Sequence, residues 1–138
     1  MPTHSKVVNL IENSQILNDS TKLATNIVCK FIILSHSKES VIILGPVSKF
    51  PYHADIVEHF CTMNNISAGW LKKPDIYEIY DKSYSINGGG WIEINIIKEI
   101  IVIYGLSTSY GKFDQTKVSA ALSTYPEYSN YSIVFKNK

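Results

Sequence analysis

Residues Ile27–Leu34 limit most strongly what this chain can fold into. The segment is rich in β-branched side chains and is apolar on both faces, with Lys30 as the exception. A short run of this kind is typical of a strand inside a sheet, where other elements cover each face. We therefore expect a buried central strand here, and the rest of the chain must supply its neighbours and its cover.

Two helices and several more strands are predicted around this segment. From Ala54 to about Met63 the apolar residues fall at helical spacing, and Asp114 is a typical N-cap for a second helix over about 115–123. The order of elements, β-β-α-β-β-β-α-β, predicts an α/β (α+β) protein with a single mixed sheet and two helices packed on it. The further predicted strands are Val41–Leu44, Ile76–Tyr80, Trp91–Ile96, Glu99–Tyr104 and Tyr131–Phe135.

Three connections are predicted from their turn-forming residues. The polar segment His36–Ser40 is short enough to join two antiparallel strands. Trp70–Asp75 is predicted to be a loop. The three glycines Gly88–Gly90 predict a sharp break, which is either a tight turn or a place where two backbone segments approach closely.

The length of the chain predicts one domain. Its 138 residues and its apolar content of 45% are enough for a hydrophobic core. We expect the domain to span residues 26–138 and to be a monomer. Residues 1–25 mix apolar and polar groups, so we expect an N-terminal arm that is a short helix, a strand against the sheet or a partly ordered segment.

The charge composition restricts the partners and the kind of site. A net charge of +1 gives no long-range attraction for nucleic acid, so we expect no nucleic-acid partner. All thirteen basic residues are lysines, and the chain contains no arginine. An anion site in this protein must therefore use lysine, backbone N–H groups and hydroxyls in place of a guanidinium group.

Cysteines and histidines give no sign of a metal site. Cys29 and Cys61 have no metal-binding spacing, and we expect two reduced thiols that are buried or half-buried. His36, His53 and His59 are not at ligand spacing either, so we expect neither a metal nor another cofactor. The sequence shows no signal peptide and no apolar run long enough to span a bilayer, which predicts a cytoplasmic protein without membrane contact.

His53 is the first candidate for chemistry. Pro51 favours an extended chain before it, and the helical pattern begins directly after it, so His53 lies in or near the first turn of a helix. Backbone N–H groups in that turn have no intrahelical partner and attract anions, above all phosphate. A histidine there is either a cap or surface residue, or a base, acid or nucleophile.

Lys30 and the loop Leu106–Gly111 are the other candidates. Lys30 either sits at the exposed end of its strand or supplies a cation to a polar site. The loop follows a strand and precedes a helix, and its N–H groups and hydroxyls are suited to surround an anion. Alternatively it is a solvated loop whose hydroxyls cap their own backbone. We expect Tyr110 to pack beneath the loop.

Four motifs occur together in one order along the chain: Tyr52–Ile56, Gly88–Gly90, Val102–Gly111 and Tyr125–Tyr128. Together they resemble the motifs of the janus and protein phosphohistidine phosphatase family. The spacing from the three glycines to the Tyr-Gly-x-Ser loop also matches that family without a gap. The resemblance extends over roughly residues 27–135, and the first core strand starts with a lysine as in the family.

The resemblance implies a six-stranded mixed sheet with two helices, and an enzyme that removes phosphate from protein phosphohistidine without a metal. Some members also act on phospholysine. By position, His53 takes the catalytic role, as a general base or as a nucleophile. The residues that correspond to substrate binding are Lys30, Ala54, Ser107, Thr108 and Ser109.

The sequence also departs from the family pattern. Trp91 stands where the family has an arginine after the three glycines, and the segment between the first helix and Gly88 is longer. Thr108 and Ser109 replace smaller or apolar residues. Two functions follow: an active phosphatase with an altered pocket, in which Trp91 stacks on the substrate's imidazole, or a catalytically weak module that binds a phosphorylated or acidic protein.

Overall fold

The computed structural model describes residues 4–11 and 26–136, which form a mixed α+β protein. One six-stranded sheet has the order β1-β3-β2-β6-β7-β8, and a separate two-stranded sheet is formed by β4 and β5. The strands of the large sheet are β1 (His4–Asn9), β2 (Asn26–His36), β3 (Glu39–Pro46), β6 (Tyr84–Asn95), β7 (Ile100–Tyr104) and β8 (Ser132–Phe135).

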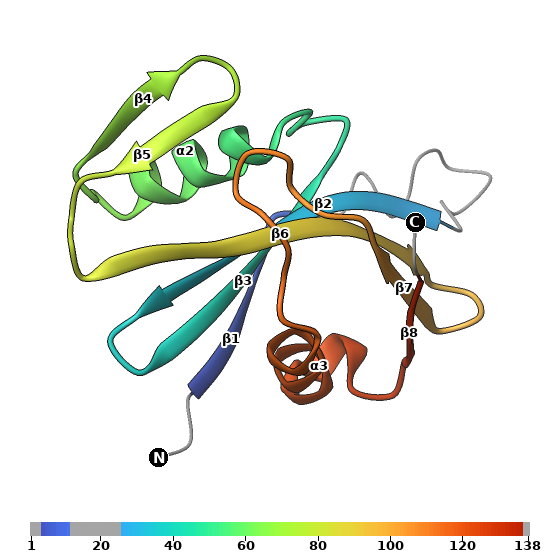
Figure 1. Cartoon of the computed structure of the whole chain (residues 1–138). Coiled ribbons are helices and arrows are strands. Elements are labelled where there is room, and N and C mark those ends of the chain that lie inside the picture. Colours follow the sequence, from blue (N-terminus) through green and yellow to red (C-terminus); the bar gives the residue numbers. More distant parts are fainter. Residues whose placement is uncertain (1–3, 12–25, 137–138) are drawn as a thin grey trace.

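Helices cover the two faces of the large sheet (Figure 1). On one face lie α2 (His53–Met63) and the hairpin of β4 (Ala68–Lys72) and β5 (Ile76–Ile79). On the other face lies α3 (Gln115–Thr124), followed by a short 3-10 helix over Pro126–Tyr128. The predicted fold class, a mixed six-stranded sheet with two packed helices, is confirmed.

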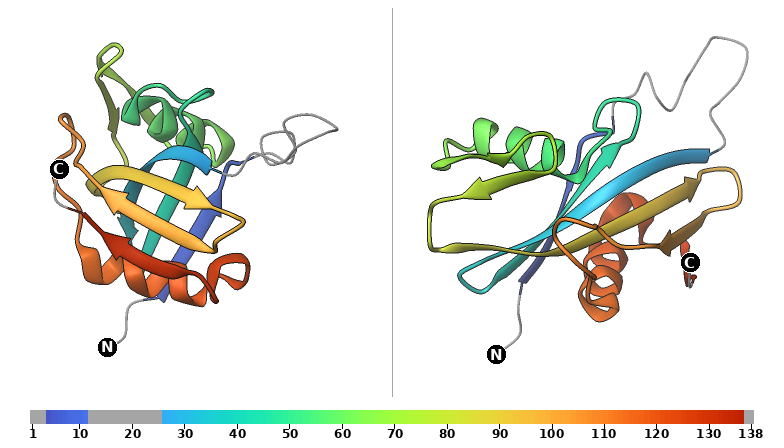
Figure 2. Two further views of the ribbon diagram at one scale, coloured as in Figure 1. Left: turned by 90° about the vertical axis from the view of Figure 1, so that its right-hand side faces the viewer. Right: turned by 45° about the horizontal axis from the view of Figure 1, so that its top comes forward.

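The sheet is mixed because each edge strand runs parallel to its neighbour, whereas the interior strands pair in antiparallel orientation. β1 runs parallel to β3 and β8 runs parallel to β7, whereas the β3, β2, β6 and β7 contacts are antiparallel. Figure 2 shows this twisted sheet from two further directions. The predicted hairpin through His36–Ser40 is confirmed, since Ser35 pairs with Ser40 and His36 with Glu39.

β2 is the buried central strand that the sequence predicted. Phe31 and Ile33 belong to the core beneath α3, and Ile32 and Leu34 belong to the core beneath α2. All four side chains are fully buried. Such burial removes apolar surface from water on both faces, which is the main stabilising term for a domain of this size. In α3 the buried residues are Val118, Ala121 and Leu122, which belong to the same core as Phe31 and Ile33.

Two predictions about the connections are wrong. Part of the predicted loop is the strand β4, in which Trp70 pairs with Tyr77 of β5 and packs edge-to-face on its ring. The three glycines Gly88–Gly90 do not turn the chain but continue β6. The alternative of a close backbone approach is confirmed, because a Cβ on Gly89 would collide with the carbonyl oxygen of Phe31.

The N-terminal segment contributes an edge strand. Of the three alternatives for this segment, a strand against the sheet is what residues His4–Asn9 form. Residues 12–25 lie outside the described residues. Cys29 and Cys61 are both buried and free, as the sequence predicted.

Candidate active site

His53 is the first residue of α2, and its side chain is only 8% exposed. Its Nε2 lies 2.9 Å from the carbonyl oxygen of Gly90 in β6. A carbonyl oxygen can only accept a hydrogen bond, so Nε2 carries the proton and donates it. Nδ1 then keeps its lone pair, and no hydrogen bond within the described residues uses it. The ring is thus held in one tautomer with a basic nitrogen available.

The surroundings keep His53 neutral. Burial lowers the pKa of His53 below its usual value of 6.5. The hydrogen bond to the Gly90 carbonyl acts in the opposite direction, and the positive charge of Lys30 lowers the pKa further. Near pH 7 the imidazole is therefore in the form that can accept a proton or attack phosphorus.

Lys30 lies inside β2, and its ammonium group reaches the start of α2. Its Nζ donates a hydrogen bond to the carbonyl oxygen of Pro51 and lies 4.8 Å from the ring centroid of Trp91. The ring of Tyr52 is 5.7 Å away on the other side. Burial lowers the pKa of Lys30, and the Asp55 carboxylate counteracts this. Of the two readings of Lys30, the structure favours a cation directed at a polar site.

The loop after β7 is closed by its own hydrogen bonds. The N–H of Ser107 donates to the carbonyls of Gly89 and Gly111, at 3.0 and 3.2 Å, and the N–H of Gly111 donates to the Ser107 carbonyl at 2.7 Å. Ser107 is 1% exposed, and its Oγ accepts the Tyr110 N–H at 3.0 Å. The backbone donor of Ser107 is therefore already used, although the residue fixes the shape of the loop.

Thr108 and Ser109 form the tip of this loop. Within the described residues, no hydrogen bond takes the N–H groups of these two residues. Thr108 is exposed and Ser109 is half-buried, so both can present an N–H and a hydroxyl to a ligand. The loop thus has features of both predicted alternatives. The Ser107 hydroxyl caps the loop's own backbone, and, among the described residues, the N–H groups of Thr108 and Ser109 remain free to surround an anion.

Tyr110 connects this loop to the β4–β5 hairpin. Its hydroxyl accepts the N–H of Tyr77 at 2.7 Å and donates to the carbonyl of Tyr77 at 2.8 Å. Its ring packs against the core beneath α2, as predicted. The β4–β5 hairpin therefore supports the loop. Sequence reasoning missed this role, because no pattern indicates which backbone group a tyrosine hydroxyl reaches.

The predicted site residues meet on three successive residues of β6. Gly89 accepts the Ser107 N–H, and a Cβ at Gly89 would lie 3.1 Å from Cδ2 of His53. Gly90 accepts the hydrogen bond of His53, and Trp91 pairs with Lys30 across the strands. In Figure 1 the loop after β7 rises past β6 on the side of α2. Ala54 is fully buried beside His53 in the first turn, where it offers its N–H.

Comparison with protein-family models identifies the family of this chain. The model of the Janus/Ocnus family (Ocnus) matches residues 18–132, which is most of the chain. The chain belongs to the Janus/Ocnus family. The predicted membership of the janus family is thereby confirmed. A search of curated proteins found no match.

In this member of the Janus/Ocnus family, Trp91 and Asp55 adjoin the site. Trp91 is half-buried, and its ring stacks on Tyr104 with centroids 6.2 Å apart and an interplanar angle of 15°. The Asp55 carboxylate accepts the backbone N–H of Tyr52 at 3.0 Å. Asp55 also places a negative charge near the first turn of α2, which opposes the binding of a second anion.

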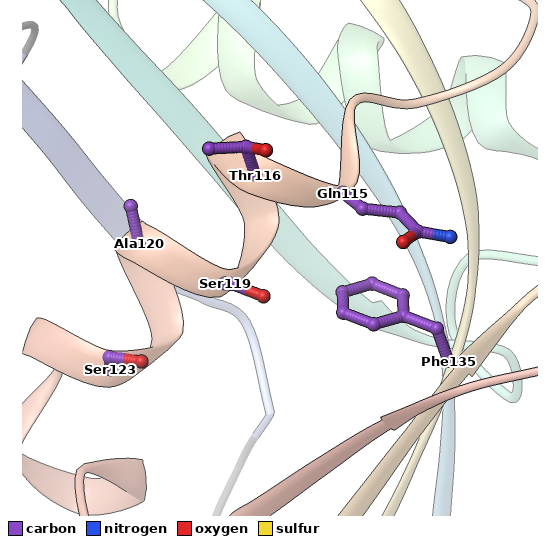
Figure 3. Close-up of a pocket in the computed structure, with 6 residues that line it drawn as sticks. All are labelled: Gln115, Thr116, Ser119, Ala120, Ser123 and Phe135. Atoms are coloured by element: carbon purple, nitrogen blue, oxygen red, sulfur yellow. The ribbon is translucent and has the colours of Figure 1, made fainter.

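Other parts of the Janus/Ocnus domain show concave surfaces away from this site. A groove of about 460 Å³ lies between α3 and β8 and is lined by Gln115, Thr116, Ser119, Ala120, Ser123 and Phe135 (Figure 3). A hollow of about 490 Å³ lies beside α2, and one of about 230 Å³ lies between the β4–β5 hairpin and β6. None of these three includes His53, Lys30 or the loop tip.

Metal-binding clusters and membrane-spanning helices are not found in the described part of the chain. No three His, Cys, Asp or Glu side chains among residues 4–11 and 26–136 lie close enough to hold a metal ion. Within the same residues, neither helix has the length and apolar character needed to cross a bilayer.

Proposed function

We propose that this protein hydrolyses the P–N bond of protein phosphohistidine without a metal, with His53 as the proton acceptor. One observation carries the proposal: the Gly90 carbonyl holds the His53 ring by Nε2 and leaves Nδ1 free at the start of a helix. The family resemblance of the motifs around His53 and Ser107 points to the same substrate.

The phosphoryl group is bound by donors from three elements. The N–H groups of His53 and Ala54 open the first turn of α2, and no hydrogen bond of the described residues uses them. Thr108 and Ser109 supply N–H groups and hydroxyls from the loop. Lys30 donates one hydrogen bond to Pro51 and can direct a further N–H at a phosphoryl oxygen. Donors fixed in advance stabilise the charge that develops during the reaction.

The chemical step is an in-line displacement at phosphorus. A water oxygen forms the new P–O bond while Nδ1 of His53 takes one of its protons. The P–N bond breaks, its electron pair goes to the substrate's imidazole, and that nitrogen is protonated by solvent. The products are inorganic phosphate and histidine. The labile P–N bond makes the departure of the imidazole easy, so positioning and charge stabilisation are the main tasks of the site.

A second route uses the same nitrogen as a nucleophile. Nδ1 then attacks phosphorus, the substrate imidazole leaves, and water hydrolyses the phosphorylated His53 in a second step. The routes differ in one measurable species. Acid-labile radioactive phosphate that stays on the protein after a rapid quench, and is lost in His53→Ala, would establish the nucleophilic route.

Release of phosphate from a phosphohistidine peptide tests the proposal. We expect His53→Ala to lower turnover by about 10²–10⁴-fold, the usual contribution of a general base. His59→Gln is the matched control, because His59 lies on the same helix and packs on Phe50 instead of facing Gly90. Equal turnover by the parent protein and His53→Ala would refute the catalytic role. A phospholysine peptide in parallel tests the second substrate class.

A second candidate function is a phosphoprotein-binding module with little catalysis. The observation that favours it is Trp91, which brings no charge to a position beside the site in a chain without arginine. Phosphopeptide binding without turnover, abolished by changing Lys30, would support this function. Rapid turnover that depends on His53 would exclude it.

A further inference from the structure

Lys30 is a lysine in an unusual place. It lies in the middle of the central strand, directly opposite Trp91 in β6 and Gly45 in β3. A lysine side chain is long and flexible, and holding its ammonium at one position costs conformational entropy. Burial also disfavours its charge and lowers its pKa. A cation that must be ready for a phosphoryl group needs contacts that fix it and keep it charged.

Trp91 supplies the closer of the two aromatic contacts of the Lys30 ammonium. The ammonium of Lys30 lies 4.8 Å from the centroid of the indole, closer than the 5.7 Å that separates it from the Tyr52 ring. An ammonium over an indole face is attracted by the π electrons, and the attraction is strongest for Trp among aromatic side chains. This contact leaves the remaining N–H donors of Lys30 directed elsewhere, one of them at the Pro51 carbonyl.

The indole is itself held in place. Tyr104 stacks beside it at an interplanar angle of 15°, and the Tyr104 hydroxyl donates to the Glu93 carboxylate at 2.8 Å. Gly105 completes the packing, because a Cβ there would lie 2.9 Å from Cδ1 of Trp91. A rigid aromatic group is a better support for a flexible lysine than a mobile one would be.

We propose that Trp91 is a positioning residue, whose indole holds the Lys30 ammonium at the start of α2 so that it binds the phosphoryl group. The inference rests on the proposed function for its consequence but not for the contact itself. It assigns the indole to Lys30 and not to the substrate's imidazole, because Lys30 covers the ring and Tyr104 stacks beside it.

The contact is tested first without any ligand. The indole ring current should displace the NMR signals of the Lys30 side chain, and Trp91→Leu should return them to ordinary lysine values. Trp91→Phe keeps an aromatic face and should keep part of the displacement. Lys30 signals that are the same in the parent protein and in Trp91→Leu would overturn the proposal, because the ammonium would then not lie over the ring.

The consequence is tested by a double-mutant cycle with inorganic phosphate as the probe. We expect Trp91→Leu to weaken phosphate binding by about three- to tenfold, as for loss of a cation–π contact, and Trp91→Phe to restore most of it. In the Lys30→Met background, Trp91→Leu should have no further effect. An equal loss in both backgrounds would mean that Trp91 acts independently of Lys30, and would overturn the positioning role.

Failure of the proposed function gives a different pattern. If the parent protein neither binds phosphate nor releases it from a phosphohistidine peptide, the proposed function is refuted. The ligand-free NMR comparison still decides whether Trp91 holds Lys30. If phosphate binding is normal and the cycle is additive, the proposed function stands and the role assigned to Trp91 is refuted.

Discussion

The starts of the two helices differ in how their backbone donors are used. At the start of α3, the Asp114 carboxylate accepts the N–H groups of Thr116 and Lys117, at 2.8 and 3.3 Å. At the start of α2, the Asp55 carboxylate reaches back to Tyr52 instead, and the N–H groups of His53 and Ala54 have no partner among the described residues. We call the start of α3 the closed helix start, because a carboxylate occupies its N–H donors. We call the start of α2 the open helix start, because two of its N–H donors are unoccupied within the described part of the chain.

This difference shows what makes a helix start usable as a binding site. The two helices have similar lengths of 11 and 10 residues and therefore similar dipoles, so the dipole does not decide the matter. The open start also has the buried His53, the ammonium group of Lys30 from β2 and the loop tip with its free donors. The start of α3 instead lies beside the groove shown in Figure 3. The site depends on the elements gathered around the helix and not on the helix alone.

The largest expected effect on stability and turnover comes from Gly89, which lies in β6 against the His53 ring. Gly89→Ala places a Cβ against the Phe31 carbonyl and 3.1 Å from the His53 ring, so backbone and ring must both move. We expect the free energy of unfolding to fall by about 2–4 kcal/mol and turnover to be lost. Gly111→Ala is the comparison, because a Cβ there meets nothing within 4 Å and only the positive φ of 93° is strained. Urea denaturation of both variants measures the difference, and equal losses would contradict it.

The next largest effect is on phosphate affinity, when one lysine is removed at each helix start. Lys30→Met removes a charged donor from the open start, and we expect phosphate affinity to fall by about 10–100-fold. Lys117→Met removes a lysine from the first turn of α3, whose N–H is already bonded to Asp114, and should leave the affinity unchanged. Phosphate titration followed by NMR measures both. A similar loss in the two variants would mean that only the overall charge matters.

Removing the N-cap carboxylate of α3 should lower the stability of the protein without changing its turnover. Asp114→Ala leaves the N–H groups of Thr116 and Lys117 without their acceptor. We expect a loss of about 1 kcal/mol, seen as a Tm lower by about 4 °C. Turnover on a phosphohistidine peptide should be unaffected at temperatures where the variant is folded. A drop in turnover without a drop in Tm would show that α3 takes part in the site.

The smallest expected effect is a shift in the pH profile. His53 must be neutral to accept a proton, and burial lowers its pKa, so turnover should decline only below about pH 6.5. Lys30→Met removes a positive charge that lowers this pKa, and the acid limb should move toward higher pH. The same linkage makes the parent protein less stable as the pH falls below about 6.5, because the unfolded chain binds the proton more readily. An acid limb that moves toward lower pH in Lys30→Met would contradict this assignment.

The sequence predicted the parts of this molecule that depend on local patterns. The buried strand around Phe31, the helix beginning at His53 and the helix capped by Asp114 were all visible as periodicity or caps, and each lies where it was expected. His53, Lys30 and Ser107–Ser109 were singled out from their positions at element ends and from the family resemblance. The structure brings His53, Lys30 and Ser107 to one stretch of β6.

Other features depend on contacts that no local pattern encodes. Three successive glycines normally indicate a turn, but in β6 they allow close packing, and Gly89 is the one that the Phe31 backbone and the His53 ring approach. The turn-forming composition of Trp70–Asp75 favours a loop, whereas the pairing of Trp70 with Tyr77 makes its first part a strand. The placement of Trp91 beneath Lys30 follows from strand register, which the sequence does not specify.

The Tyr110 hydroxyl joins the loop to the β4–β5 hairpin through both backbone groups of Tyr77. Since one oxygen atom makes both bonds, the hairpin and the loop tip gain or lose order as a unit. Residues of the hairpin that never touch an anion can therefore set how tightly one is held. Under the proposed function, the hairpin would in this way act as a support that sets the affinity of the site while its donors stay the same.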